Sequence, residues 1–468
     1  MHKNAGSDFL VHKLTATERK SVRSKTLGNG SRVAVIGGGP AGSFFSYFLL
    51  DLAQRIDMHI QVEIYEPRDF FTPGPKGCNM CGGIISESLV QTLAAEGIPL
   101  PSGVIQRGID SYLLHTDTGS VRIETPLNEK RIGAVHRGAG PKDSEGTKWG
   151  GFDGYLQILA IEKGAQLHQT RVEDVTFSDG YPTLRSSNGQ TKSYDLLAIT
   201  SGVNTNTLKI FQNLNIGYDP PKTTRTLIRE YYLGQKNVDD FIGTSMHVFL
   251  LDIPRIKFAA LIPKEDYVTL CLLGDDLDET TLQIFLNCPQ VRQCFPPDFD
   301  LQNSCKCLPR MVTKGSSQPY ADRMIFIGDC GVSRLYKDGI GAAYRCAKAA
   351  ATACIFEGIS KDDFKQYYWP FCKSMHRDNK FGKLVFAVTH LLRKRLFTRR
   401  AVTRMVLSEQ NKEGKHRIMS TVLWDMFTGS ASYKDIFLLT LQPIFLISFF
   451  QHIISALWNG TIYNNSMR

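Results

Sequence analysis

The chain has 468 residues, of which 42% are hydrophobic and 21% are charged, and this balance is typical of an ordinary globular protein rather than of a disordered or fibrous chain. Its length accommodates two or three domains with a sizeable core. The formal net charge is +10, but no recognised nucleic-acid-binding module accompanies the positive charge, so a nucleic acid is not expected as a partner.

The beginning of the chain carries little structural signal. Residues 1–30 are polar and basic with no clear periodicity, which predicts a mobile tail. They contain no secretory hydrophobic segment, so the eleven scattered cysteines are expected to be reduced thiols of a cytoplasmic protein.

The next segments have the pattern of a dinucleotide-binding unit. An apolar strand over residues 32–36 runs into a glycine-rich turn, a helix follows through residues 43–53, and a second strand over residues 59–65 ends in an acid. The glycines permit a tight turn and bring backbone N–H groups and the helix N-terminus close to a pyrophosphate, while the acid accepts from a ribose hydroxyl. The predicted cofactor-binding residues of this unit are Gly37, Gly39, Pro40, Ala41, Gly42 and Glu66.

Two cysteines follow at the spacing Cys-x-x-Cys, Cys78 and Cys81. This spacing is typical of a dithiol redox pair or of half a metal site, whose other half would be Cys305 and Cys307. The Cys-x-Cys spacing of the second pair is unusual for zinc, so no metal site is predicted. Simple packing of both thiols in the interior is the remaining alternative.

Four strand-like runs separated by turn residues predict an antiparallel sheet in the second half of the chain. They cover residues 226–233, 247–251, 256–262 and 267–273.

A second glycine-containing segment lies nearly three hundred residues after the first. A strand over residues 323–327 ends in Gly328 and Asp329, and a loop leads to a long Ala-rich helix that extends from Ala342 to about Phe356. This segment resembles the second FAD fingerprint of the large flavoprotein family of monooxygenases, halogenases and geranylgeranyl reductases. In that family the aspartate binds the ribitol chain of FAD, which makes Asp329 the matching residue.

The resemblance also assigns residues at the start of this helix. Gly339, Ile340 and Gly341 would bring backbone N–H groups and the positive end of the helix against the flavin pyrimidine edge. Tyr336 departs from the family, which usually has proline at its position.

The resemblance extends over about residues 31–385 and implies an α/β fold, with a Rossmann-type FAD-binding domain, an inserted antiparallel-sheet substrate domain and a helical C-terminal extension. Segments 151–156 and 171–175 resemble the helix and strand that close over the adenine half, and Arg137 and Val172 are assigned to cofactor binding with them. The expected domain ranges are 31–100, 130–215 and 305–375 for FAD, 101–129 and 216–304 for the substrate sheet, and 376–468 for the extension.

Cys81, Gly82 and Gly83, together with the earlier Lys76 and Cys78, resemble the Lys-x-Cys-Gly-Gly segment that geranylgeranyl reductases carry beside the flavin, as if three residues had been inserted. The resemblance therefore implies that all three residues from Cys81 to Gly83 contact the cofactor. Cys81 is the predicted proton donor after hydride transfer, and Cys78 is the second catalytic candidate.

The predicted strand over residues 256–262 carries a second family landmark. Phe258 and Pro263 fit the aromatic-x-Trp-x-aromatic-Pro motif of the reductases, and Ile262 with Pro263 also fits the halogenase motif. Neither family tryptophan is present, which reshapes the cavity. The predicted substrate-binding residues are Phe258, Ala260, Ile262 and Pro263.

These motifs favour an FAD-dependent reductase that transfers hydride from flavin N5 to a C=C bond of a lipidic, prenyl-type substrate. The alternatives are a flavin-dependent monooxygenase or hydroxylase, and an electron-transfer flavoprotein that donates to quinone, although the ferredoxin-like four-Cys cluster of some such proteins is not present. The chain has one full dinucleotide fingerprint, so the reductant would be NAD(P)H bound transiently near the flavin or an electron-donor protein.

The C-terminal region combines basic and apolar segments. Residues 379–408 contain eight Lys or Arg and no acid, interleaved with apolar residues, a pattern typical of a helix on an anionic membrane surface. Residues 436–458 contain no charged residue but are interrupted by Pro443 and polar side chains. An interfacial or re-entrant anchor, a docked core helix and a membrane span all remain open, and peripheral membrane association is expected.

Overall fold

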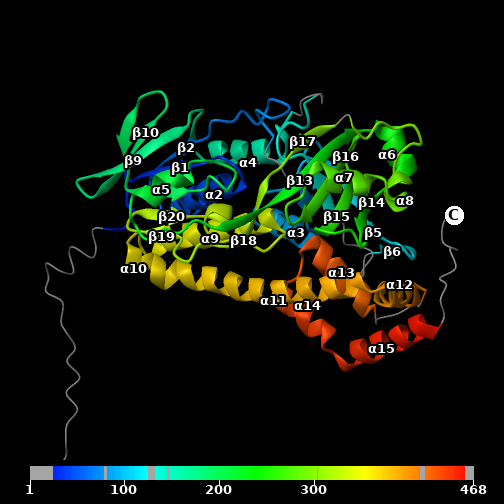
Figure 1. The fold of residues 1–468 in the computed structure, drawn as a ribbon. Helices are drawn as coiled ribbons and strands as arrows, with labels where there is room; N and C mark the ends of the chain where they lie inside the picture. Colours follow the sequence, from blue (N-terminus) through cyan, green and yellow to red (C-terminus); the bar gives the residue numbers. More distant parts are fainter. Residues whose placement is uncertain are drawn as a thin grey trace, which may run out of the picture.

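The computed structural model describes residues 25–78, 82–124, 132–142, 144, 148–302, 304–411 and 417–458. Two large sheets lie side by side, and a long helix runs beneath both of them (Figure 1). Residues 1–24 of the expected tail lie outside the described part. Residues 25–30 are packed against the body, where the Lys25 ammonium pairs with Asp322 at 3.0 Å and the Lys25 carbonyl accepts from Ile359 N.

The first sheet has six strands in the order β19-β20-β12-β1-β2-β8. All neighbouring pairs are parallel except β19 with β20. Parallel neighbours require crossover connections, and helices pack on the sheet for that reason. The strands are β1 (Arg32–Ile36), β2 (Gln61–Tyr65), β8 (Gln166–His168), β12 (Leu196–Ile199), β19 (Tyr320–Ala321) and β20 (Met324–Phe326).

The crossover helices match the sequence expectation closely. Helix α2 (Pro40–Arg55) begins three residues before the predicted start because Pro40, which lacks an N–H group, suits the first helical position. Helix α9 (Gly339–Phe356) lies along α2, and Phe44 meets Tyr344 edge to face at 5.6 Å. Helix α4 (Gly151–Glu162) also packs on α2. The predicted Rossmann-type α/β fold is confirmed.

Smaller elements surround this sheet. A three-stranded sheet β11-β10-β9 projects at one end of the molecule (Figure 1), and a second small sheet has the order β3-β7-β4. The bounds are β3 (Ile84–Ile85), α3 (Glu87–Ala95), β4 (Ile105–Ile109), β7 (Ile132–Val135), β9 (Val172–Ser178), β10 (Tyr181–Ser186), β11 (Thr191–Ser193), α5 (Leu208–Asn213) and α10 (Lys361–Asp363).

The second large sheet has eight strands, ordered β17-β13-β16-β15-β14-β5-β6, with β18 also paired to β13. The four predicted strands correspond to β13, β14, β15 and β16. The pairs β13–β16, β16–β15 and β15–β14 are antiparallel, whereas β14 pairs with β5 in parallel. Its strands are β5 (Ser111–Thr116), β6 (Gly119–Glu124), β13 (Lys222–Tyr232), β14 (Ser245–Phe249), β15 (Ile256–Pro263), β16 (Tyr267–Gly274), β17 (Cys305–Cys307) and β18 (Arg310–Lys314).

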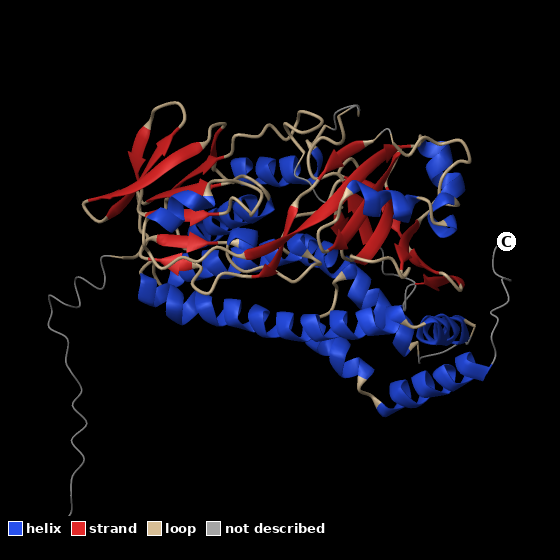
Figure 2. Cartoon of the chain, viewed as in Figure 1, coloured by secondary structure: helices blue, strands red, loops and turns tan. Residues whose placement is uncertain are grey.

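The predicted 305–375 segment of the FAD domain begins inside this sheet. Residues 305–314 were assigned to the FAD domain, but β17 and β18 pair with the free edge of β13. Strand β13 is eleven residues long, and the backbone N–H and C=O groups along this edge require hydrogen-bond partners. The two short strands β17 and β18 supply them. Helices α6 (Gln235–Phe241), α7 (Glu279–Leu286) and α8 (Pro289–Arg292) cover one face of the sheet (Figure 2).

The C-terminal region is entirely helical where it is described, and it covers the other face of this sheet. The predicted boundary at residue 376 falls inside one continuous helix, α11. The helices are α11 (Trp369–Lys394), α12 (Leu396–Gln410), α13 (Ile418–Thr428), α14 (Tyr433–Thr440) and α15 (Pro443–Trp458).

The predicted apolar segment 436–458 is broken into two helices. Helix α14 ends at Thr440 and α15 begins at Pro443, since proline removes an N–H group and clashes with the preceding turn. Within the described residues, no single helix has the length and hydropathy needed to cross a membrane; α14 and α15 meet the criteria only when taken together, across a bend of 64°.

Part of the basic run faces the protein and not the solvent, which corrects the expectation that the whole run meets a membrane. Arg399 forms a two-point pair with Asp117, with its Nε 2.6 Å from Oδ1. Arg393 donates to the Ile256 carbonyl, and Arg404 donates to the Ser455 carbonyl at 2.6 Å. These arginines therefore dock the helices onto the sheet and onto α15. The basic residues that stay exposed are Lys380, Lys383, Lys394 and Arg395.

A buried carboxylate joins α12 to α13. Glu409 on α12 accepts from Met419 N at 2.9 Å, Ser420 N at 2.8 Å and the Ser420 hydroxyl at 2.7 Å. A carboxylate at a helix N-terminus satisfies backbone donors and complements the helix dipole.

We expect Glu409→Gln to lower the free energy of unfolding by about 1–3 kcal/mol, because the amide removes the charge and replaces one acceptor by a donor. Urea denaturation followed by circular dichroism measures this. The exposed Glu162→Gln on α4 is the control and should be neutral. Equal stability of the two variants would contradict the capping role.

Candidate functional site

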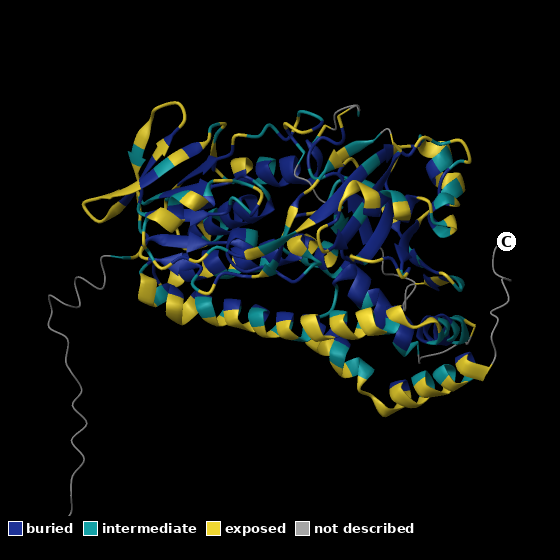
Figure 3. Cartoon of the chain, in the orientation of Figure 1, coloured by how far each residue is buried: buried dark blue, intermediate teal, exposed yellow. Residues whose placement is uncertain are grey.

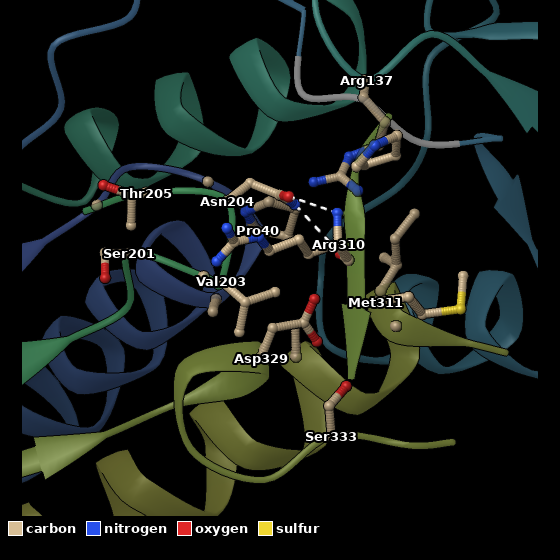
Figure 4. Close-up of a pocket in the computed structure, with 18 of the residues that line it drawn as sticks. Pro40, Arg137, Ser201, Val203, Asn204, Thr205, Arg310, Met311, Asp329 and Ser333 are labelled. Carbon is tan, nitrogen blue, oxygen red and sulfur yellow. Dashed lines mark hydrogen bonds between the residues drawn. The ribbon is translucent and has the colours of Figure 1, made fainter. Parts of the chain in front are cut away.

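A single cavity of about 1220 Å³ extends from the N-terminus of α2 to the inner face of the second large sheet. Small-ligand pockets usually measure about 300–1,000 Å³, so this cavity has room for a large ligand. Figure 4 shows its middle part, where Arg137 and Asp329 approach from opposite sides of the view. The predicted cofactor residues that line it are Gly37, Gly39, Pro40, Ala41, Glu66, Gly82, Gly83, Arg137, Val172, Asp329, Gly339 and Ile340.

The glycine turn brings the N-terminus of α2 to the cavity. Gly37 has φ of +113°, and a Cβ there would lie 2.8 Å from the Thr200 carbonyl oxygen. Gly42 does not line the cavity, but a Cβ on it would overlap the Gly37 carbonyl oxygen. Both positions therefore require glycine, one for the turn and one for the close packing of helix on strand, and the open helix end forms an anion site.

Glu66 is held rigidly beside this turn. Its carboxylate accepts from Gly38 N and from Arg68 N, both at 2.9 Å. Burial raises the pKa of Glu66, while the two backbone donors favour its ionised form. The carboxylate lines the cavity, where it can also accept from a sugar hydroxyl.

Asp329 lines the cavity three residues after the end of β20. Burial raises the pKa of Asp329, and Ser333 and Arg137 oppose that effect. Arg137 is itself anchored by the fully buried Asp153, with Nε–Oδ1 and Nη2–Oδ2 distances of 2.5 and 3.0 Å. The buried carboxylate of Asp329 can therefore accept hydrogen bonds from hydroxyl groups of a ligand, and these bonds would offset the cost of its burial.

The N-terminus of α9 also faces the cavity. Gly339 and Ile340 line it, whereas Gly341 does not. A Cβ on Gly341 would overlap the Asp338 carboxylate, which pairs with Arg345 at 2.8 Å. Gly341 therefore makes room for this ion pair, which is a different role from the predicted contact with the flavin.

The cysteine segment is described only in part. Cys81, the predicted catalytic residue, lies outside the described residues. Cys78 is half-buried with its backbone N bonded to the Gly74 carbonyl at 2.7 Å, and it is not among the described residues that line the cavity. Gly83 has φ of +74°, and a Cβ there would overlap the Val135 carbonyl oxygen. The roles of both cysteines stay predictions.

The second half of the cavity is apolar. Phe258, Ala260 and Ile262 line it, but Pro263 does not, because alternate residues of β15 point to opposite faces of the sheet. Neighbouring strands and α13 complete this wall with Ile228, Met246, Cys271, Leu273 and Phe427.

Sequence reasoning missed two polar residues of this apolar half. Cys271 on β16 is half-buried there, close enough to Gly82 that a Cβ on the glycine would lie 2.9 Å from its sulfur. Lys337 extends from the loop between Asp329 and Gly339. The sequence did offer a signal for Lys337. A charged residue there directly follows Tyr336, the position at which the chain departs from the family motif.

A separate polar cluster lies inside the second sheet, outside the cavity. The His247 Nε2 donates to the Ile242 carbonyl at 3.1 Å, so His247 Nδ1 accepts from His115 Nε2 at 3.0 Å, and Cys294 lies beside them. Both imidazoles are buried, and burial lowers the pKa of His247 to about 4. The imidazoles of this cluster thus have hydrogen-bond partners within the sheet domain.

Comparisons with known proteins identify the fold. No protein-family model and no curated protein sequence matches the chain. A flavoprotein/dehydrogenase from Cytophaga hutchinsonii matches with 13% identity and a TM-score of 0.62, over 91% of this chain and 100% of that one. The halogenase PltM, in a mutant form with FAD, matches with 11% identity and a TM-score of 0.57 over 92% of both chains.

An oxygenase of 2-methyl-3-hydroxypyridine-5-carboxylic acid matches with 14% identity and a TM-score of 0.56, over 79% of this chain and 94% of that one. The chain therefore has the fold of FAD-dependent flavoprotein oxidoreductases.

The residues of the cavity fit FAD. Two helix N-termini, Glu66 and Asp329 all lie at one cavity, where they supply the positive helix ends and the carboxylate acceptors that a pyrophosphate and sugar hydroxyls require. The glycine positions that a Cβ would block lie at the pyrophosphate end. The apolar half beyond α9 leaves space for a second molecule.

Proposed function

We propose that this chain is an FAD-dependent oxidoreductase acting on an apolar substrate. The observation that carries the proposal is the continuity of one cavity from the glycine turn of α2, past Asp329 and the start of α9, to the apolar wall of β15. FAD, when bound, supplies the redox chemistry, and the protein supplies binding, orientation and exclusion of water.

The chain's own residues have separate tasks in this proposal. The backbone around Gly39 binds the pyrophosphate, and Glu66 and Asp329 accept from hydroxyl groups of the ribose and the ribityl chain. The N-terminus of α9 stabilises negative charge on the reduced ring. Phe258, Ala260 and Ile262 hold the substrate against it.

Within this class, we favour reduction of a C=C bond in a lipidic, prenyl-type substrate, as in geranylgeranyl reductases. The apolar wall and the small Ala260, in place of a bulky ring, support an extended apolar substrate. Electrons would come from NAD(P)H or from a donor protein. A monooxygenase is the second candidate, because oxygenases and halogenases share this fold across most of the chain.

We expect the purified protein to be yellow with bound FAD, and Asp329→Ala and Gly42→Ala to lose most of it. The first removes the central acceptor, and the second forces α2 away from Gly37. Flavin absorbance relative to protein after gel filtration measures the occupancy. Gly28→Ala, at a glycine with open space around its Cβ position, and the exposed Asp298→Ala should retain FAD. Full occupancy in all four variants would refute the assignment.

Stopped-flow oxidation of the reduced protein by air separates the two candidate reactions. A reductase should reoxidise slowly, without a transient absorbance, because its site does not stabilise an oxygen adduct. A transient C4a-hydroperoxide spectrum would favour the monooxygenase instead and would set the reductase proposal aside.

We also propose that the C-terminal helices bind an anionic membrane surface. Helix α15 contains no charged residue, and only Phe445 and Ala456 on it are buried. Its outer side is exposed in Figure 3, and α11 adds further exposed apolar side chains beside basic ones. The large exposed apolar residues here are Leu384, Val388, Leu391, Leu438, Leu441, Ile444, Leu446, Ile447, Phe450, Ile454, Leu457 and Trp458.

This surface has the chemistry of an interfacial helix. Ile447, Phe450, Ile454 and Leu457 follow one another on α15 at spacings of three or four residues, so they share one exposed face, and such an apolar face is unusual on a surface that meets only water. Lys380, Lys383, Lys394 and Arg395 are exposed nearby and complement anionic lipid headgroups. A membrane-bound enzyme would also meet a lipidic substrate at its source.

We expect the protein to float with vesicles of phosphatidylserine and phosphatidylcholine, and the triple variant Ile447→Asn, Phe450→Asn, Ile454→Asn to remain unbound, because the apolar face is lost. Flotation in a density gradient measures this. Ile284→Asn, at an exposed isoleucine on α7, is the control. Raised salt should weaken binding only partly. Equal flotation of the triple variant and the unchanged protein would refute the proposal.

A further inference from the structure

The apolar half of the cavity contains a cation. Lys337 lines the cavity, and its Nζ lies 3.4 Å from the ring centroid of Phe258. Its hydrogen bond to the Phe427 carbonyl is 3.5 Å long, at the outer limit for such a bond. An ammonium group has three donors, so this long bond leaves hydrogen-bonding capacity for a ligand in the cavity.

Among the described residues, no carboxylate forms an ion pair with Lys337. The adjacent Asp338 pairs instead with Arg345 at 2.8 Å and with Arg334 at 3.4 Å. The residues that β13 to β16 and α13 contribute to the cavity lining include no charged group, and they are apolar apart from Cys271, Thr226 and Thr428. A cation in such surroundings is costly unless a ligand supplies the opposite charge.

The backbone on both sides of Lys337 is strained. Tyr336 and Asp338 have φ of +62° and +54°, a left-handed conformation that side chains other than glycine rarely adopt. Contacts with other segments hold both residues in this conformation. The Tyr336 ring packs on Phe386 with a centroid distance of 4.9 Å, and Asp338 pairs with Arg345. Strain of this kind persists where neighbours impose it, and it clusters at ligand sites.

We propose that Lys337 determines substrate specificity by binding a carboxylate carried by an otherwise apolar substrate. The proposal rests on the proposed function, since it places this substrate in the half of the cavity beyond the FAD site. The hydrocarbon part lies against Phe258 and Ile262, and the acid end lies at the ammonium group.

The proposal predicts that the affinity for an acidic ligand depends on pH. Burial lowers the pKa of Lys337 to about 7. The titratable or charged groups facing it are Cys271 from β16, and Arg334, Tyr336 and Asp338 from its own loop, while β15 and α13 present phenylalanines. Carboxylates are ionised above about pH 5. Binding of the acid should therefore be strongest between about pH 5 and 7 and should weaken above that range as the lysine loses its proton.

Titration calorimetry with two small probes, octanoate and its neutral analogue octanamide, tests the proposal on the full-length protein. We expect the unchanged protein to bind octanoate about tenfold to a hundredfold more tightly than octanamide at pH 6.5, the range for a charge-assisted hydrogen bond. Lys337→Met should lose this preference and its pH dependence, while keeping its affinity for octanamide. Lys337→Arg should keep part of the preference, and Lys306→Met, at an exposed lysine of β17 outside the cavity, should keep all of it.

Flavin content is measured first in every variant. Loss of FAD from Lys337→Met would overturn the proposal by assigning the lysine to the cofactor. Equal affinity of the unchanged protein for the two probes, or an unchanged acid preference in Lys337→Met, would also overturn it. If neither the unchanged protein nor any variant binds FAD, the proposed function fails. The preference for octanoate over octanamide can still be measured in that case, so the two failures are distinguishable.

Discussion

The close approach of α2 to the ends of β1 and β12 is the constraint on which the rest of the site depends. The Thr200 hydroxyl, at the end of β12, donates to the Ile36 and Gly37 carbonyls at 3.0 and 2.7 Å. Gly42 allows the helix to meet this turn without a side chain between them. The second helix end of the cavity is positioned from this contact, because α9 packs along α2 and its N-terminus reaches the same cavity.

The C-terminal helices support the same cavity from the other side. Asn379 on α11 accepts from Leu335 N at 2.9 Å and donates to the Ser333 carbonyl at 2.8 Å. The Tyr433 hydroxyl on α14 donates to the Leu335 carbonyl, and Arg334 donates to the carbonyls of Gly429 and Ala431. These bonds hold the loop that bears Lys337. The helices that carry the exposed apolar surface therefore also position the proposed substrate-binding loop.

This connection gives the proposals a common physical basis. A membrane-bound α15 would hold α14 near the lipid surface, and α14 contacts the loop directly through Tyr433. A substrate with an apolar body and an acidic end is also the kind of molecule that resides at a membrane interface. The exposed surface of α15, the loop that bears Lys337 and the apolar wall of β15 thus favour the same class of ligand, an apolar molecule with an acidic end.

Local sequence patterns determined the dinucleotide unit, the second fingerprint and the four central strands. The spacing of Gly37, Gly39 and Gly42 follows from backbone geometry within a single strand-turn-helix, and the alternation along β15 follows from the period of a strand. For this reason those elements were predicted correctly in type, with ends within about four residues of the observed ones. The same period excludes Pro263 from the wall that holds Phe258, a point that the motif comparison overlooked.

Tertiary structure decided what depends on contacts between distant segments. The pairing of β17 and β18 with β13, the burial of Arg393 and Arg399, and the aim of Lys337 into the cavity were not readable from local pattern. A basic residue has the same appearance in a sequence whether it meets solvent, a carbonyl group or a cavity. Its environment is set by residues far away along the chain, and these are brought beside it only when the chain folds.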